Sequence, residues 1–181
     1  MGWGLGMAVV DGLNAEEIAA RLGMDLTDET VEYYTGALYM VGLHHDGRGL
    51  VVTDTAAEVT PLEDERLLAR LSSGAKVVVF EINEAIDLYR VTYWANGMMA
   101  WRVTHCHQEA DTEALEVLGQ PPRVLGDIEG QYRAVQAEAE ARGEILDPYG
   151  SIVVDLFNSI TGIEFDMPGW WADLEYRALE P

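Results

Sequence analysis

The stretch of sequence that decides the fold is residues 76–105, which read KVVVFEINEAIDLYRVTYWANGMMAWRVTH. Apolar and polar side chains alternate along much of it, and Asn96-Gly97 divides its second half. Alternation with a period of two is typical of strands, and Asn-Gly between such runs indicates a hairpin. The stretch therefore predicts three antiparallel strands over Lys76–Ile82, Asp87–Trp94 and Met98–His105.

The loop between the second and third of these strands determines their register. If residues 95–97 form a three-residue loop, Tyr93 lies opposite Met99 and the large apolar side chains share one face. A two-residue turn would instead set Arg102 opposite Val91 and divide the apolar set. Because a shift of one residue moves every side chain to the other face, the apolar pairing favours the longer loop.

The remaining sequence predicts further strands and helices on both sides of this stretch. Strands are predicted over Leu5–Val10, Leu38–Leu43, Leu50–Thr53 and Leu174–Leu179, and residues 115–118 form either a strand or a helical turn. Helices are predicted from the Asn14 N-cap to Leu22, from Pro61 to Leu71, and over Asp127–Arg142 and Ile152–Ile160. Residues 28–35 fit neither pattern clearly.

Length and composition indicate one folded unit. The chain has 181 residues, of which 49% are hydrophobic, and this fraction is too high for a disordered chain. No Pro-, Gly- or Ser-rich linker divides it. We predict a single α+β domain over residues 1–181, in which a central antiparallel β-sheet is flanked by helices packed mainly on its apolar face.

The chain is strongly acidic. It carries 32 acidic against 11 basic side chains, a formal net charge of −21. Residues 1–75 and 106–181 have net charges of −9 and −12, whereas residues 76–105 are neutral. Because nucleic-acid phosphates need Lys and Arg to neutralise them, the charge argues against a nucleic-acid partner.

The sequence also bears on location. No apolar run approaches the roughly 18 residues of a membrane span, so no membrane partner is expected. The first residues lack the pattern of a signal peptide. The single cysteine, Cys106, excludes an internal disulfide and fits a reducing compartment. We therefore predict a cytoplasmic protein.

All four histidines lie in two short clusters, His44-His45 and His105-Cys106-His107. His105 and His107 share a face of a strand, and with a third ligand from the other cluster they would hold a transition metal such as zinc. Alternatively, these residues end strands and form turns without any ligand, since no spacing matches a specific zinc signature. The candidate metal ligands are therefore His44, His45, His105 and His107, and in the alternative the protein has no cofactor.

No catalytic constellation emerges from the sequence. The G-x-S-x-G, P-loop, H-E-x-x-H and EF-hand motifs are absent. Cys106 and its neighbouring histidines point to opposite faces of a strand, so sequence adjacency does not make a nucleophile and base. Close carboxylate pairs are expected by chance among 32 acids. We assign no catalytic residue.

Three tryptophans are candidate binding residues. Trp94 lies near the predicted hairpin tip on the less apolar face, and Trp170 and Trp171 follow a Pro-Gly step. In such places an indole either anchors an interface or caps the core under a helix, where its large area is hidden.

Several segments resemble uncharacterised bacterial proteins of modest size. The likeness is carried by Leu71–Ile82, Tyr89–Trp94, Trp101–His105, Leu115–Pro122 and Ile152–Asp166. Such proteins often have His-Asp after the tryptophan-containing strand, where this chain has His105-Cys106-His107. The resemblance implies an immunity or interaction module and carries no catalytic residues.

Two functional hypotheses follow, from different classes. The first is a non-enzymatic binding protein, such as an immunity-like inhibitor of a basic toxin or enzyme, whose acidic field attracts its partner. The second is a metal-dependent enzyme built on the histidine clusters. A third interpretation is that the charge serves solubility alone, and the distribution of acids over the surface distinguishes it from the first.

Overall fold

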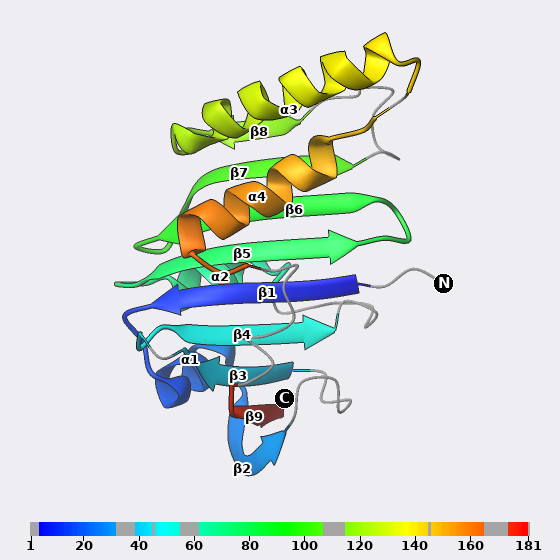
Figure 1. The fold of residues 1–181 in the computed structure, drawn as a ribbon. Coiled ribbons are helices and arrows are strands. Elements are labelled where there is room, and N and C mark those ends of the chain that lie inside the picture. The colour runs from blue at the N-terminus through cyan, green and yellow to red at the C-terminus, as the bar shows by residue number, and fades with distance from the viewer. Residues whose placement is uncertain are drawn as a thin grey trace.

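The computed structural model of the protein describes residues 4–31, 39–44, 46–54, 62–106, 115–144, 146–164 and 174–180. Within these ranges the chain forms a nine-stranded antiparallel sheet and four helices, an α+β fold as predicted (Figure 1). The strands are β1 (Gly4–Asp11), β2 (Asp25–Val31), β3 (Tyr39–Leu43), β4 (Gly49–Asp54), β5 (Lys76–Asn83), β6 (Leu88–Ala95), β7 (Met98–Cys106), β8 (Glu116–Gly119) and β9 (Tyr176–Glu180).

The strand order across the sheet is β2-β9-β3-β4-β1-β5-β6-β7-β8. The middle position thus belongs to β1, and the predicted three-stranded centre, β5 to β7, lies on one side of it. The last strand of the chain, β9, inserts between β2 and β3. The sheet therefore needs both the beginning and the end of the chain.

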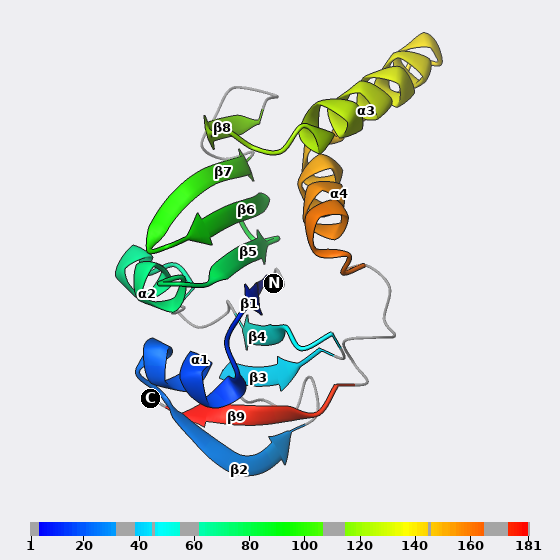
Figure 2. The ribbon, with the colours of Figure 1, turned by 90° about the vertical axis from the view of Figure 1, so that its left-hand side faces the viewer.

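Helices cover both faces of the sheet. Figure 2 shows α1 (Ala15–Leu22) and α2 (Glu65–Leu71) on one face and α3 (Val124–Ala141) and α4 (Tyr149–Thr161) on the other. The prediction that helices pack mainly on one face is wrong. The reason lies in strands such as β1, in which seven successive residues are buried, so that both of its faces need cover.

Each face has its own hydrophobic core. On the α4 side, the Phe80 ring of β5 stacks on the Phe157 ring of α4 with centroids 4.8 Å apart. On the other side, Val79 of β5 belongs to a cluster with Ile18 of α1 and Leu71 of α2. Successive residues of β5 thus alternate between the two cores, as the pleat requires.

The β6–β7 connection differs from the predicted three-residue loop. Ala95 pairs with Met98, so the turn has two residues, Asn96 and Gly97. Both have positive φ, 53° and 79°, which is the conformation that Asn-Gly favours in tight hairpins. The local turn chemistry therefore prevails over the apolar pairing argument.

A β-bulge reconciles this short turn with the apolar face. Trp94 pairs with Met99 but Tyr93 pairs with Trp101, which leaves Ala100 as an extra residue in β7. Beyond the bulge, Tyr93 and Trp101 stack on one face with ring centroids 5.8 Å apart. Because a bulge shifts the register by one residue, the tight turn forms while Trp101 and Val103 lie opposite Tyr93 and Val91 on one face. The predicted Tyr93–Met99 pair is wrong, since Met99 pairs with Trp94 and packs on the other face.

The ends of the helices follow local signals. Asn14 caps α1, since its side chain accepts the Glu17 amide while the Glu17 carboxylate accepts the Asn14 amide. In α2 the N-cap is Asp64, so the helix begins at Glu65 and not at Pro61, which lies outside the described residues. β2 was not predicted, and its acidic sequence explains why no strand pattern is visible there.

Candidate functional site

The structure does not bring the two histidine clusters together. His44 directly follows β3 and His105 lies in β7, with four strands between them in the sheet. Five strand spacings of about 4.8 Å place them about 24 Å apart across the sheet. One ion cannot bind both, so the hypothesis of a shared site fails for these two residues, and His45 and His107 lie outside the described residues.

His44 belongs to the β3–β4 turn. Its Nδ1 lies 2.8 Å from an Asp46 carboxylate oxygen, and the other oxygen of Asp46 lies 2.6 Å from the Arg48 guanidinium. The hydrogen bond from Arg48 holds the pKa of Asp46 well below its usual range. This arrangement fits the alternative interpretation of His44 as a turn residue.

His105 lies in a different environment, a cluster with Asp87 and Asp147. One ligand atom from each of the three residues can be chosen so that all lie within 4.8 Å of one another. The His105 Nε2 is 3.5 Å from an Asp147 carboxylate oxygen, and the side chain is only 2% exposed. We refer to Asp87, His105 and Asp147 as the His105 cluster.

Three elements build the His105 cluster. Asp87 ends the turn between β5 and β6, His105 is near the end of β7, and Asp147 precedes α4. The start of α4 lies close to the sheet here, because a Cβ on Gly150 would come within 2.9 Å of the Tyr89 ring. Glycine at this position therefore lets α4 carry Asp147 to the end of β7.

Aromatic rings line the same place. The His105 ring stacks on the Tyr149 ring with centroids 5.5 Å apart, and the Tyr89 ring lies 6.3 Å away. Burial raises the pKa of the Tyr89 hydroxyl, and the negative charges of Asp87, Glu84 and Asp147 raise it further. The surroundings of His105 are thus partly apolar and electrostatically negative.

Sequence reasoning singled out His105 but missed Asp87 and Asp147. The sequence offers 32 acids, and these two are separated from His105 by 18 and 42 residues. Asp147 has one local signal, since it precedes Pro148 and its side chain accepts the Tyr149 amide at the start of α4. Only the fold shows which acids meet the histidine.

The predicted binding residue Trp94 is buried. It is 5% exposed and belongs to the core cluster beneath α1 and α2, so it is not an exposed anchor. As predicted, Trp94 lies on the less apolar face of the hairpin. Near the hairpin, however, α2 and the neighbouring strands cover that face, so the indole is buried. Trp170 and Trp171 lie outside the described residues.

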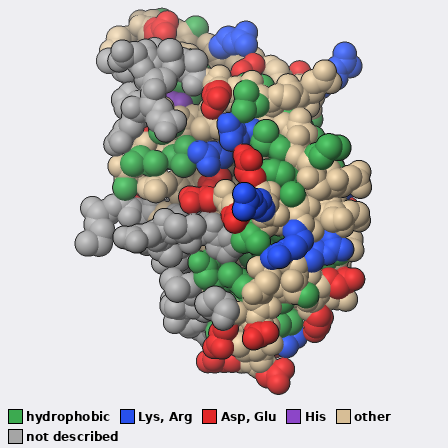
Figure 3. Space-filling view, turned by 180° about the vertical axis from the view of Figure 1, so that it is seen from behind, with side chains coloured by type: hydrophobic (Ala, Val, Ile, Leu, Met, Phe, Trp, Pro, Cys, Tyr) green, Lys and Arg blue, Asp and Glu red, His purple; other side chains and the backbone are tan. Residues whose placement is uncertain are grey.

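Farther along the same side of the sheet lies a polar face. Its members are Glu81 of β5, Arg90, Thr92 and Trp94 of β6, and Arg102 and Thr104 of β7. Figure 3 shows basic and acidic side chains lying next to one another in the middle of this side. Within the described ranges the atoms Glu81 Oε1, Arg90 Nε, Thr92 Oγ1, Trp94 Nε1, Arg102 Nε and Thr104 Oγ1 are buried without a hydrogen-bond partner.

Glu81 is the buried acid of the polar face. It is 4% exposed, and its second carboxylate oxygen lies 3.3 Å from the Arg90 guanidinium. Burial raises its pKa to about 7, although the positive charges of Arg90 and Arg102 act in the opposite direction. Glu81 therefore changes charge near neutral pH.

A cavity of about 370 Å³ opens between the end of α4 and the sheet. Its lining includes Tyr93, Trp101, Arg48, Lys76 and Asp11. Arg48 binds Asp46 and donates to the Thr161 carbonyl at 2.7 Å, and Lys76 lies 4.0 Å from Asp11. Among the described lining residues, Arg48 is held by contacts inside the chain, whereas the Lys76–Asp11 pair is largely exposed.

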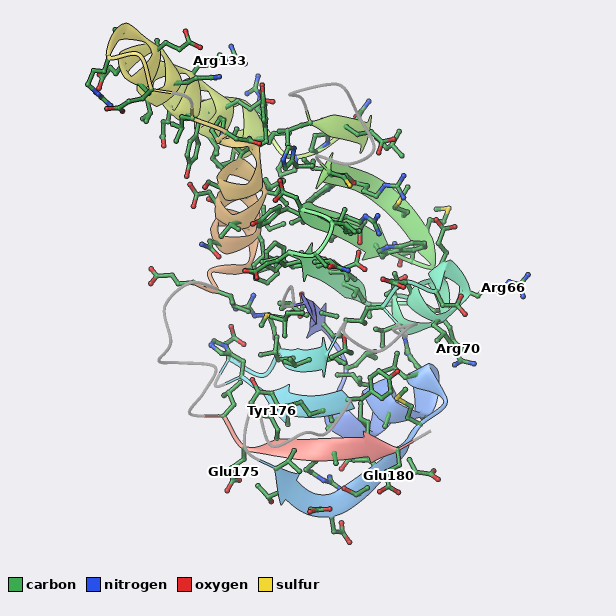
Figure 4. All side chains as sticks on the ribbon, turned by 90° about the vertical axis from the view of Figure 1, so that its right-hand side faces the viewer. Arg66, Arg70, Arg133, Glu175, Tyr176 and Glu180 are labelled. Atoms are coloured by element: carbon green, nitrogen blue, oxygen red, sulfur yellow. The ribbon has the colours of Figure 1, made fainter. Side chains whose placement is uncertain are left out.

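The opposite end of the sheet, where β2, β9 and α1 lie, is acidic. We define the acidic edge as seven exposed carboxylates, those of Glu16, Glu17, Asp25, Asp28, Glu29, Glu175 and Glu180. Acidic side chains gather at this lower end in Figure 3, and Figure 4 shows Glu175 and Glu180 at the two ends of β9. The acids therefore follow an edge of the sheet rather than a random scatter.

Three basic residues of the described part of this region, Arg21, Arg70 and Arg177, make contacts inside the chain, and Arg70 donates to the Arg21 carbonyl. Arg177 donates to the Thr27 carbonyl and pairs with Glu16 and Asp28. Arg21 donates to the backbone carbonyls of Leu71 and Ser73. The acidic edge thus keeps an excess of negative charge directed to solvent.

Acids are also frequent at the α3 end, but there they alternate with exposed bases. Arg133 of α3 projects outward (Figure 4), its side chain is 75% exposed, and it lies 3.5 Å from Glu129. Arg142 pairs with Glu144 at 2.9 Å, and its side chain is 57% exposed. Residues 123–144 hold five acids and three bases, so acids are less in excess here than at the acidic edge.

Comparison with known proteins adds no relative: no family model, no curated protein and no solved structure matches this chain. The resemblance to uncharacterised bacterial proteins therefore stays a prediction. None of the helices in the described ranges is long and apolar enough to span a membrane.

Proposed function

We propose that this protein is a non-enzymatic, cytoplasmic binding protein that recognises a basic protein partner through the acidic edge. The observation that carries the proposal is the grouping of seven exposed carboxylates around three described arginines, Arg21, Arg70 and Arg177, each of which makes contacts inside the chain. Such a field attracts a positively charged surface and increases the rate of encounter.

The backbone of β2 makes this edge selective. Among the described strands β2 pairs only with β9, so no described strand pairs with the backbone on its other side, which is the kind of edge that can add a strand. Two copies of this chain repel one another there, because Asp25, Asp28 and Glu29 would meet their own counterparts. A basic strand or loop meets attraction instead, so the same charges oppose self-association and favour a basic partner.

An immunity-like inhibitor of a basic toxin or enzyme is the form of this function that we favour. Inhibitors of this kind work by covering a functional surface, and such surfaces on toxins that act on anionic substrates are themselves basic. The partner would then lose its activity on binding. The absence of a catalytic motif in the sequence is compatible with this role.

The test compares two triple variants with the same change in charge. Asp25→Asn/Glu29→Gln/Glu180→Gln neutralises the acidic edge and spares Glu16 and Asp28, which pair with Arg177. Asp127→Asn/Glu138→Gln/Glu140→Gln is the matched control on α3. Each protein is used to capture partners from lysate at low and high salt, and the affinity for the purified partner is measured by calorimetry.

We expect a basic partner whose binding weakens with salt. The edge variant should bind it about tenfold more weakly, since three exposed charge pairs contribute roughly 1.5 kcal/mol together, and the α3 control should bind almost as tightly as the wild type. Acidic partners, or equal losses in both variants, would contradict the proposal. An edge variant that self-associates while still binding every partner would show that the charges serve solubility alone.

A further inference from the structure

The His105 cluster has the composition of a metal site. It combines one imidazole and two carboxylates, and the three ligand atoms lie within 4.8 Å of one another. We propose that Asp87, His105 and Asp147 bind a divalent transition-metal ion, for which zinc is the reference. The site is independent of the acidic edge and of the function proposed for it.

A second observation, besides the carboxylates, points to a ligand. His105 is 2% exposed, and its Nδ1 has no hydrogen-bond partner among the described residues. A buried, unpaired imidazole nitrogen costs free energy, so a structure that keeps one needs a compensating interaction at the ring. An ion coordinated by Nδ1 supplies that interaction, whereas an ion on Nε2 takes the place of the 3.5 Å contact with Asp147, and either one fixes the ring against Tyr149.

The charges balance. Two carboxylates and a neutral imidazole carry a total charge of −2, which equals the charge of the ion in magnitude. Without an ion, Asp87 and Asp147 leave a negative charge next to the buried ring. The ion pairs shown for described Lys and Arg residues involve other acids, not Asp87 or Asp147. A bound divalent cation neutralises this charge.

The donor set selects the class of ion. Imidazole nitrogen is a preferred ligand of zinc and other late first-row metals, whereas magnesium and calcium prefer sites made of oxygen alone. Three protein ligands also leave at least one coordination position for water or another molecule. The cluster therefore favours zinc over magnesium.

For the three ligand atoms to bind one ion, they must move slightly closer together. Ligand atoms about 2.1 Å from an ion lie at most about 4.2 Å apart, somewhat less than the 4.8 Å within which the three atoms lie. Asp147 is able to make this adjustment, because its side chain is 45% exposed and it precedes α4 rather than lying within it. One oxygen of Asp147 accepts the Tyr149 amide at 3.0 Å, and the other faces His105.

The experiment uses the full chain, purified without a histidine tag, and isothermal titration with ZnCl2 and separately with MgCl2. Asp87→Asn and Asp147→Asn remove one ligand each while keeping the size of the side chain, and asparagine tolerates the positive φ of 51° at position 87. His105 is left unchanged because it is buried. Glu84→Gln is the matched control, since it removes one charge from the same turn and no ligand.

We expect the wild-type chain to bind one equivalent of zinc and to prefer it strongly to magnesium. Loss of a residue that only hydrogen-bonds a metal ligand weakens metal binding roughly 10- to 100-fold, and each asparagine variant should weaken zinc binding by more than this. Glu84→Gln should change the zinc affinity by less than about threefold. Co²⁺ titration, followed by its visible absorption, should give the same order of affinities. Circular dichroism shows whether each variant is folded.

Three results would overturn the inference. The first is that the wild-type chain binds no zinc, and the second is that Asp87→Asn and Asp147→Asn bind it as tightly as the wild type. The third is that the wild-type chain binds several equivalents of zinc weakly and that Glu84→Gln lowers this binding as much as the other two variants do. Such a result would show a general attraction of zinc to negative charge. None of these results bears on the acidic edge, which has its own test.

Discussion

Glu81 is a carboxylic acid placed among groups that favour opposite protonation states. Burial in the polar face favours the neutral form and raises the pKa to about 7, while Arg90 favours the charged form. The pKa in the folded chain is thus above the ordinary value of 4.5. Between these two pH values the folded chain holds a proton that the unfolded chain releases, so this residue stabilises the fold at low pH and the contribution is lost as pH rises through 7.

Substitution of this residue should separate the two forms. Glu81→Gln resembles the protonated acid, so we expect a variant more stable than the wild type by up to about 3 kcal/mol at pH 8, with little difference at pH 4.5. Urea unfolding at both pH values measures it. Glu140→Gln on exposed α3 is the control and should change stability by less than about 0.5 kcal/mol at either pH. A Glu81→Gln variant that is less stable at pH 8 would show that the Arg90 ion pair prevails.

At the scale of the elements, the β6–β7 turn and helix α3 use glycine in opposite ways. Gly97 has φ 79°, which the two-residue turn requires and which residues with a Cβ adopt at a cost. Gly130 lies in the helical interior of α3, and a Cβ there would meet nothing within 4 Å. The first glycine is required by geometry, whereas the second only weakens its helix.

The same substitution should therefore have opposite effects at the two positions. Gly97→Ala should destabilise the fold by about 1–2 kcal/mol, because alanine is strained in the left-handed region. Gly130→Ala should stabilise it by up to about 1 kcal/mol through helix propensity. Thermal and urea unfolding measure both. Equal destabilisation by the two variants would indicate that packing rather than backbone conformation determines the effect.

At the scale of the whole molecule, the charge of the described residues is concentrated at the two ends of the sheet. The acidic edge lies at one end and the acids of α3 and its surroundings lie at the other, whereas acids and bases are nearly balanced on the strands between them. A net charge of −21 on 181 residues means that the folded chain repels itself. Salt screens this repulsion, with a Debye length of about 30 Å at 0.01 M and about 8 Å at 0.15 M.

We therefore expect added NaCl to stabilise the fold. Between about 0.01 and 0.15 M the melting temperature should rise by a few degrees, equivalent to about 1–2 kcal/mol. Differential scanning calorimetry at several salt concentrations measures the change. The edge variant Asp25→Asn/Glu29→Gln/Glu180→Gln should show a smaller rise because it begins with less repulsion. A melting temperature that falls with salt would mean that internal ion pairs outweigh the repulsion.

The sequence by itself determined the local elements. Period-two alternation and turn residues located β5, β6 and β7, and Asn14 with Glu17 located the start of α1. These signals depend on neighbours within a few residues, which is why the α+β class was predictable. The same reasoning failed at the bulge in β7, because an extra residue in a strand leaves no mark on a pattern read one strand at a time.

Only the tertiary structure decided which distant residues meet. It placed β9 between β2 and β3, put helices on both faces, and gathered the acids of β2, β9 and α1 on one edge. It also separated His44 from His105 and gave His105 two aspartates as neighbours. Sequence predicted the residue type, histidine, but not its partners, because strand order and helix placement are set by burial of apolar surface over the whole chain.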